Sequence, residues 1–272
     1  MGLLDRGIEI KTARQVHAMR EAGLVVGRTL ELMRASVRAG ISTAELDAIA
    51  EDHIRASGAT PSFKGYHGFP GSICASVNDE VVHGIPGPRV LADGDLVSID
   101  CGAIVDGWHG DAAITVAVGD VSDELRDLMR VTEEAMWRGI AAARPGGRVG
   151  DISHAVEQHV RASGSFGIVE DYTGHGIGTQ MHQPPDVPNL GRAGRGPKLV
   201  AGLALAVEPM ITMGDQDTEV LEDDWTVVTA DGSWAAHFEH TFALTADGPW
   251  VLTALDGGEE MLGRLGVAFG GR

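Results

Sequence analysis

The sequence predicts an α+β fold, built as two copies of one unit in which a pair of helices is followed by strands. The first observation is a diverged repeat: residues 38–58 align without gaps on residues 144–164 and share eight identities, including a closing Arg-Ala-Ser-Gly. The second is that an amphipathic helix precedes each copy and strand-like segments follow it. We therefore expect two helix pairs covering a curved, mostly antiparallel sheet.

The predicted helices follow the order long, short, long, short. Apolar residues at helical spacing mark residues 12–37 and 122–143 as the long helices. The first short helix follows a Ser-x-x-Glu capping box at residues 42–45. The second short helix is expected to begin behind Asp151.

Strand-like segments complete each half. They cover residues 96–105 and 111–118 in the first half, and 203–208, 225–230 and 235–245 in the second. No linker separates the halves, so we expect a single domain over residues 1–272, with halves at about 12–120 and 121–255. We expect a mobile Pro/Gly-rich loop over residues 183–198 and a partly disordered tail over residues 256–272.

Composition excludes several classes of function. The chain is 43% hydrophobic and 22% charged, and no apolar run is long enough to span a membrane. Residues 1–15 show no apolar signal core, so we expect a cytoplasmic protein and, by default, a monomer. The net charge of −18 repels phosphate backbones and argues against direct nucleic-acid binding. Two cysteines without a CxxC motif argue against a disulfide framework and a structural zinc site.

Four carboxylates and one imidazole lie in glycine-punctuated or strand-like segments typical of functional sites. This set of side chains suits a pair of divalent ions such as Mn, Fe, Co or Zn. The five candidates are Asp100, Asp111, His175, Glu208 and Glu239.

The repeat extends to these candidates. Asp100 closes LVSID as Glu208 closes LALAVE, and the triplet at 109–111 (His-Gly-Asp) corresponds to that at 237–239 (His-Phe-Glu). Each half therefore contributes two carboxylates from equivalent strands, and a pseudo-two-fold arrangement would bring all four to one centre.

A hairpin explains why Asp100 and Asp111 should meet. Asp106-Gly107 is a strong signal for a two-residue turn, which pairs residue 105 with 108 and residue 102 with 111. Asp100 and Asp111 then become diagonal neighbours on one face, with Cα atoms roughly 7–8 Å apart. Two carboxylates at that distance repel each other unless a cation lies between them. By the same alternation, Cys101 faces away from the metals.

Five ordered motifs span nearly the whole chain, about residues 8–255. They are SVNDEVVHGIP at 76–86, LVSIDCGAIVDGWHGD at 96–111, YTGHGIGTQMH at 172–182, LALAVEPM at 203–210 and HFEHTFALT at 237–245. Together they resemble methionine aminopeptidases of type 1, which are members of the pita-bread metallopeptidase family. The duplicated fold of that family also accounts for the repeat.

The resemblance implies a role for each matching position. The five candidates would be the ligands of a central dinuclear site for Co, Mn, Fe, Zn or Ni, with Asp111 and Glu239 bridging the ions. The residues implied as catalytic are His83, His182 and Glu208, and the two histidines would also face the substrate. The implied methionine pocket is formed by Tyr66, Phe69, Cys74, Met181 and Trp225, with Phe63 beside it. Met181 departs from the phenylalanine that many members carry.

The implied activity is metal-dependent removal of the N-terminal methionine from nascent proteins and peptides, with preference for a small second residue. A metal-activated hydroxide would attack the first peptide bond. Glu208 would carry the proton from the water to the leaving amine, and His182 would hydrogen-bond the scissile carbonyl oxygen. His83 would contact the substrate nitrogen or assist the proton transfer.

Two other functions fit the same fold. A prolidase or Xaa-Pro aminopeptidase usually carries an extra N-terminal domain, for which 272 residues leave no room. A non-enzymatic binding module would have lost metal ligands, and all five are present here. The type 2 enzymes carry a large insertion, and the short spans 182–208 and 208–239 favour type 1. Any transient ribosome contact would use the basic loop Arg192–Lys198.

Overall fold

The computed structural model describes residues 7–271; residues 1–6 and 272 of the expected single domain lie outside the described residues. The α-helices in the described range are α1 (Ala13–Ser36), α2 (Thr43–Ala56), α3 (Asp123–Ala142), α4 (Val149–Ser163) and α5 (Glu259–Arg264). The predicted order of long and short helices is confirmed, and α5 follows the second half.

Side chains that accept backbone hydrogen bonds fix the helix starts. Ser42 and Glu45 form the predicted capping box of α2, in which each side chain bonds the other's backbone N–H. The predicted start of α4 is wrong by three residues, because the helix begins at Val149 and Asp151 lies inside its first turn. Its carboxylate accepts hydrogen bonds from the backbone N–H groups of Arg148 and Gly194, both at 2.7 Å.

The strands form one large sheet and two small ones. They are β1 (Thr60–Pro61), β2 (Ile73–Val77), β3 (Glu80–Val82), β4 (Leu96–Val105), β5 (Trp108–Ala117), β6 (Gly167–Ile168), β7 (Gly174–Gly176), β8 (Gln183–Val187), β9 (Ala204–Val207), β10 (Met210–Thr212), β11 (Thr218–Val220), β12 (Val227–Thr229), β13 (Ala235–His237), β14 (Glu239–Leu244) and β15 (Pro249–Val251). The large sheet has the order β1-β4-β5-β14-β9-β7-β8, with β2 on β4 and β15 on β14. Its pairings are antiparallel, as predicted.

Three predictions about irregular segments need correction. The predicted strand 235–245 breaks at Phe238, and its two parts, β13 and β14, join different sheets. The predicted loop 183–198 begins as strand β8, because β7 offers it a pairing edge. The predicted disordered tail contains α5, whose Leu262 is fully buried in the main core.

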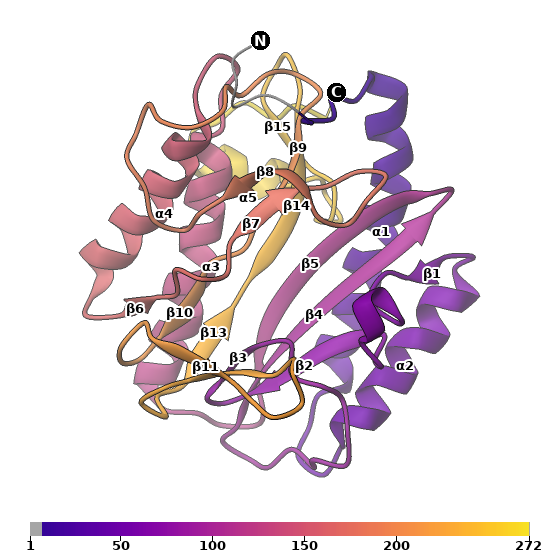
Figure 1. The fold of residues 1–272 in the computed structure, drawn as a ribbon, viewed down its shortest axis with the longest axis vertical. Helices are drawn as coiled ribbons and strands as arrows, with labels where there is room; N and C mark the ends of the chain where they lie inside the picture. The colour runs from indigo at the N-terminus through magenta and orange to yellow at the C-terminus, as the bar shows by residue number, and fades with distance from the viewer. Residues whose placement is uncertain (1–6, 272) are drawn as a thin grey trace.

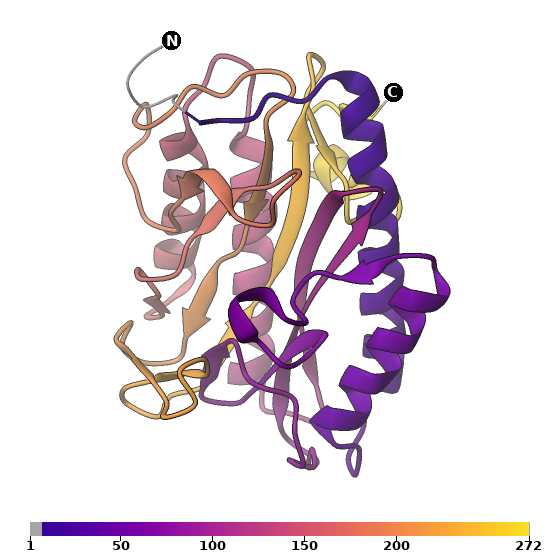
Figure 2. The same cartoon turned by 45° about the vertical axis from the view of Figure 1, so that its right-hand side comes forward.

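The two helix pairs flank the long strands, one on each side (Figure 1). Helix α1 packs along β4 and β5, and the view in Figure 2 shows α1 and α2 running beside that hairpin. Helix α3 packs on β13 and β14 of the second half, and α4 packs on α3. Among the described residues, no helix combines the length and apolar character needed to cross a membrane.

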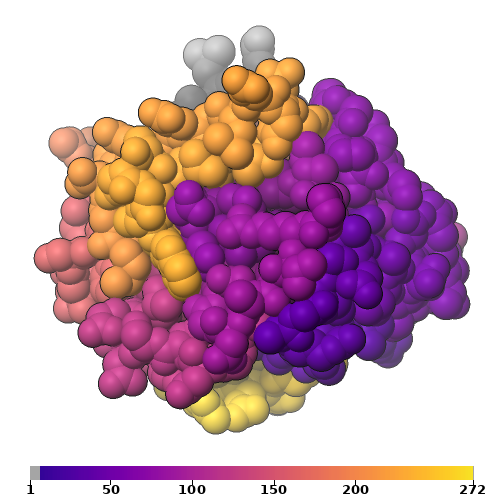
Figure 3. All heavy atoms as spheres, turned by 90° about the horizontal axis from the view of Figure 1, so that it is seen from below, coloured from indigo at the N-terminus to yellow at the C-terminus, as the bar shows by residue number. Residues whose placement is uncertain are grey.

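The halves of the chain join at two places in the sheets. In the large sheet, β5 of the first half pairs with β14 of the second. In a small sheet, β3 pairs with β12 through Val82 and Val227. Figure 3 shows the second contact region from below, with segments of the first half (purple) against segments of the second (orange). The centre of the large sheet therefore receives residues from both halves.

Glycines permit the close packing of α1. A methyl group at Gly110 of β5 would lie 2.8 Å from the Gly23 nitrogen, and one at Gly23 would lie 2.2 Å from the Leu252 carbonyl oxygen. We expect Gly23→Ala to lower the free energy of unfolding by about 1–3 kcal/mol through overpacking, although alanine is the better helix former. Chemical denaturation measures this change.

Gly263 provides the matched control, because it lies in α5 with open space around its Cα. Gly263→Ala should be neutral or stabilise by up to about 1 kcal/mol. Equal responses of the two variants would contradict the close helix–sheet contact.

Candidate metal centre and adjoining pocket

Three of the candidate carboxylates lie on one face of the large sheet. The β4–β5 hairpin has the predicted register, with Val105 opposite Trp108 and Gly102 opposite Asp111. Asp100 lies opposite Ala113, and Ala113 also lies opposite Glu239 of β14. Asp100, Ala113 and Glu239 therefore form a row across three strands. Asp111 lies two residues before Ala113, on the same face.

The other two candidates come from the neighbouring strands β7 and β9. Glu208 directly follows β9, and His175 is the central residue of β7. The glycines around His175 let β7 approach its neighbours: a methyl at Gly174 would lie 2.4 Å from the Ala206 carbonyl oxygen, and one at Gly176 would lie 2.3 Å from that of Pro184. His175 Nε2 comes to 3.4 Å from Glu208 Oε1. The structure thus brings all five candidates together.

Burial makes this acidic cluster electrostatically unfavourable. Burial raises the pKa of Asp100 to about 7. Burial and the nearby Glu239 and Asp100 hold the pKa of Asp111 well above its ordinary value. The pKa values of Glu208 and Glu239 are raised in the same way, by burial and by neighbouring carboxylates. A cation would relieve this repulsion.

Several polar atoms of the cluster lack a hydrogen-bond partner. Asp100 Oδ1, Asp111 Oδ1 and Glu239 Oε1 are buried without one, although buried polar atoms are normally satisfied. Ligand atoms of Asp111, His175 and Glu239 lie within 4.8 Å of one another. Carboxylate oxygens and an imidazole nitrogen at that spacing fit divalent ions.

The hydrogen bond and the charge state of His175 leave one ring nitrogen able to accept a cation. Its Nδ1 lies 3.0 Å from the Gly176 carbonyl oxygen, which fixes the Nδ1–H tautomer and leaves Nε2 free. Burial lowers the pKa of His175 to about 3, so the ring is neutral at pH 7. The approach of Nε2 to Glu208 is therefore a contact between a neutral ring and a carboxyl group rather than an ion pair.

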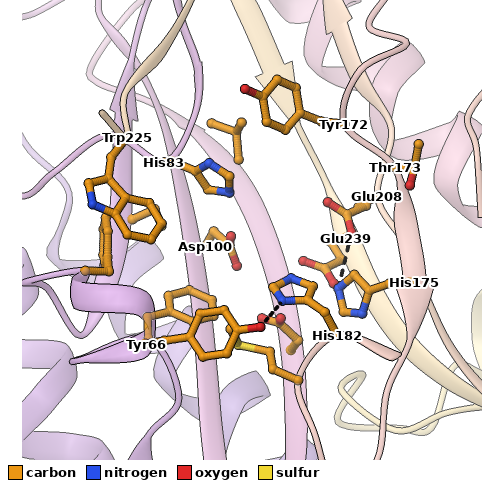
Figure 4. A pocket seen from close by; sticks show the side chains of 16 residues that line it. Tyr66, His83, Asp100, Tyr172, Thr173, His175, His182, Glu208, Trp225 and Glu239 are labelled. Atoms are coloured by element: carbon orange, nitrogen blue, oxygen red, sulfur yellow. Dashed lines mark hydrogen bonds and ion pairs between the residues drawn. The ribbon is translucent and has the colours of Figure 1, made fainter. Parts of the chain in front are cut away.

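An apolar pocket adjoins the carboxylates. Phe63, Phe69, Cys74 and Met181 form a buried cluster, with Tyr66 and Trp225 packed against it. These side chains and the carboxylates line a cavity of about 180 Å³. Figure 4 shows Tyr66 and Trp225 on one side of the cavity, His175, Glu208 and Glu239 on the other, and Asp100 between them.

The sheet register explains why pocket and carboxylates share one cavity. Cys74 of β2 lies opposite Asp100, so the row described above extends to the pocket wall. Cys101, which follows Asp100 in β4, belongs to the main core. Its side chain therefore faces away from the carboxylate cluster, as the strand alternation predicted.

Two further predicted residues line the cavity. His182 Nδ1 lies 2.9 Å from the Tyr66 hydroxyl, and its ring centroid is 4.3 Å from that of His175. The His83 ring stands edge-on to Tyr172, with centroids 5.7 Å apart. Burial, aided by His182, lowers the pKa of His83 to about 4, which keeps it neutral at pH 7.

Sequence reasoning missed several cavity and cluster residues. Val82, Tyr172 and Thr173 also line the cavity, and the last two belong to the same motif as His175. His237 lies close to Glu208 and Glu239. Its place in the repeated triplet at 237–239 was the signal for it, but only Glu239 of that triplet was selected.

Comparisons with known proteins agree with this geometry. Metallopeptidase family M24 matches residues 17–246. Methionine aminopeptidase 1 of Mycobacterium tuberculosis is 57% identical over 91% of this chain and 96% of its own length. The crystal structure of methionine aminopeptidase from Rickettsia prowazekii has a TM-score of 0.89 and 41% identity, covering 90% of this chain and 99% of that one.

Xaa-Pro peptidases, the alternative class considered above, are less similar to this chain. Xaa-Pro dipeptidase from Bacillus anthracis has a TM-score of 0.72 and 25% identity, and the match covers 90% of this chain but 61% of that one. The pita-bread fold and the resemblance to type 1 enzymes are thereby confirmed: the chain belongs to metallopeptidase family M24 and, within it, to the methionine aminopeptidases.

Proposed function

We propose that this protein is a cytoplasmic, single-domain enzyme that removes the N-terminal methionine from nascent proteins and peptides, preferring a small second residue. The observation that carries the proposal is the apolar pocket around Phe69, Cys74 and Met181, which opens directly onto the carboxylate cluster. A methionine side chain seated there would present its peptide bond to the cluster. Thioether and aromatic side chains are suitable partners for a thioether substrate.

The five candidates are proposed to hold two divalent ions, with Co, Mn, Fe, Zn and Ni all suited to the donor set. Such ions supply an activated water and polarise the carbonyl oxygen. The surrounding carboxylates would also attract the positively charged α-amine of the substrate, which confines cleavage to the first residue.

Glu208 is proposed to move the proton. Its carboxylate accepts a proton from the attacking water and delivers it to the leaving amine nitrogen. Its side chain, 12% exposed and beside the neutral His175, would limit competition from bulk water for that proton.

His182 is proposed to hydrogen-bond the scissile carbonyl oxygen through Nε2–H. The Tyr66 hydroxyl, 2.9 Å from Nδ1, supports that role, because a hydrogen bond donated to Nδ1 keeps the ring proton on Nε2. His83, held between the rings of Tyr172 and Trp225, would accept a hydrogen bond from the substrate's backbone nitrogen.

Nascent chains are the proposed clients, and transient ribosome contact through Arg192, Arg195 and Lys198 is part of the proposal. These three side chains are exposed. Neutralising them should reduce co-sedimentation with ribosomes, and unchanged co-sedimentation would remove the loop from the proposal.

The direct test is mass spectrometry of the peptides Met-Ala-Ser-Lys and Met-Lys-Ser-Ala, incubated with protein plus Mn or Co. We expect methionine to leave the first peptide only and EDTA to abolish the reaction. Asp111→Asn should lose at least about 10³-fold in turnover together with stoichiometric metal, because a carboxylate that would hold the ions is removed.

Asp106→Asn is the control for that variant, because Asp106 lies exposed at the tip of the same hairpin. Wild-type turnover and metal content in Asp111→Asn would refute the site. Cleavage of neither peptide with any metal would favour the Xaa-Pro or binding-module functions.

The role of Tyr66 is tested with Tyr66→Phe. We expect kcat to fall about tenfold with little change in KM, since hydrogen bonds of this kind stabilise the transition state. The ¹⁵N shifts of the His182 ring should show loss of a pure Nε2–H tautomer. Tyr172→Phe is the control, because Tyr172 is the other tyrosine of the chain and lines the same cavity. Equal kinetics and unchanged ¹⁵N shifts in both variants would contradict the assigned role.

The raised pKa values predict how metal-free protein responds to pH. The folded state binds protons on these carboxylates more tightly than the unfolded state, so their contribution to stability is lost as pH rises through the folded pKa values, about 7 for Asp100. The histidines with lowered pKa are neutral in both states above pH 7. In EDTA, Tm should therefore fall between pH 7 and 8.5.

Two comparisons check the origin of that fall. Saturating metal should remove it, and Asp100→Asn, which mimics the protonated carboxyl group, should weaken it. A metal-free Tm that is flat or rising over this range would mean that the carboxylates do not repel one another as described.

A further inference from the structure

His237 is held at the edge of the carboxylate cluster and has no assigned role. It ends β13, and Glu239 begins β14; ligand atoms of these two side chains lie within 4.8 Å of each other, while Phe238 between them enters the main core. Its side chain is 1% exposed. The backbone is fixed by Thr115, whose hydroxyl donates to the His237 carbonyl oxygen and accepts from its N–H, both at 2.9 Å.

The Nε2 atom of His237 shares a feature with the proposed metal ligands. It is buried and has no hydrogen-bond partner, as are Asp100 Oδ1, Asp111 Oδ1 and Glu239 Oε1. A buried histidine that served packing alone would be expected to satisfy this nitrogen. Its position beside the other unpartnered atoms indicates that the proposed ions also satisfy this nitrogen.

The distance from His237 Nε2 to Glu208 shows whether the two side chains form a hydrogen bond or are spaced as two ligands of one ion. His237 Nε2 lies 3.8 Å from Glu208 Oε2, which is too long for a hydrogen bond. Ligand atoms of Glu208, His237 and Glu239 nevertheless lie within 4.8 Å of one another. Two ligands bound at about 2.1 Å to one ion lie roughly 3.0–4.2 Å apart, so the 3.8 Å between His237 Nε2 and Glu208 Oε2 fits joint coordination.

We propose that His237 is a sixth protein ligand, which binds through Nε2 the ion that Glu208 and Glu239 also hold. The inference rests on the proposed metal centre. A second imidazole would make the centre richer in nitrogen than the five-ligand set and would shift its preference toward Fe, Co, Ni and Zn and away from Mn.

The test counts coordinated histidines without using catalysis. Proton NMR of the Co(II)-loaded protein shows strongly shifted resonances for each imidazole bound to the ion. We expect two sets in the unaltered protein, from His175 and His237, and one set in His237→Gln. Titration calorimetry should show one Co(II) binding step weakened about tenfold or more in that variant.

His240→Gln is the matched control, because His240 lies three residues away but bonds Thr253 through Nδ1 and packs on Trp137. It should keep both sets of resonances and both affinities. The count in the unaltered protein needs no variant, so the proposal stays testable if His237→Gln fails to fold.

The outcomes also separate this inference from the proposed function. A single shifted set in the unaltered protein, lost only in His175→Gln, would overturn the role of His237 and leave the five-ligand centre standing. Failure of the unaltered protein to bind Co(II) stoichiometrically would overturn both.

Discussion

Mutual repulsion among buried carboxylates is the constraint on which the rest of this structure depends. At an effective dielectric constant of about 20, two charges 4.8 Å apart repel by about 3.5 kcal/mol, and ligand atoms of Asp111 and Glu239 lie within that distance. A fold that places such groups together inside its core is stable at neutral pH only with protons or cations among them. The carboxylate cluster therefore lowers the stability of the metal-free protein, and binding of the proposed ions would be coupled to folding.

The sheet supplies the rigidity that this repulsion requires. Small residues allow close packing at the centre of the sheet. Ala113 lies between Asp100 and Glu239 on neighbouring strands, and Gly110 leaves room for α1 to pack against β5. Helix α1 packs on β4 and β5, and α3 packs on β14, so the strands that carry these carboxylates are supported by helices. Because β5 and β14 come from different halves, the carboxylate cluster is built from both halves, and neither half alone contains all five candidate residues.

The apolar pocket lies beside the carboxylate cluster because strands β2 and β4 are paired. Cys74 on the pocket wall lies opposite Asp100 in the cluster, so an apolar side chain can be buried at the point where its peptide bond meets the acidic centre. Hydrogen bonds position the two histidines: His182 is hydrogen-bonded to the Tyr66 hydroxyl, and His175 to the Gly176 carbonyl oxygen. Burial lowers the pKa of both histidines, so neither ring carries a positive charge that would repel a cation.

The sequence by itself determined the features that local patterns encode. Helical spacing and a capping box located α1 and α2, Asp106-Gly107 fixed the register that places Asp100 and Asp111 on one face, and the repeat pointed to Glu208 and Glu239. Only the tertiary structure decided the rest: the pairing of β5 with β14, the strand β8, the buried helix α5, the Tyr66–His182 bond and the position of His237. The physical reason is the distance along the chain over which each interaction acts. Periodicity, caps and turns act over a few residues, whereas strand partners and unsatisfied buried atoms arise from contacts between segments far apart in the chain.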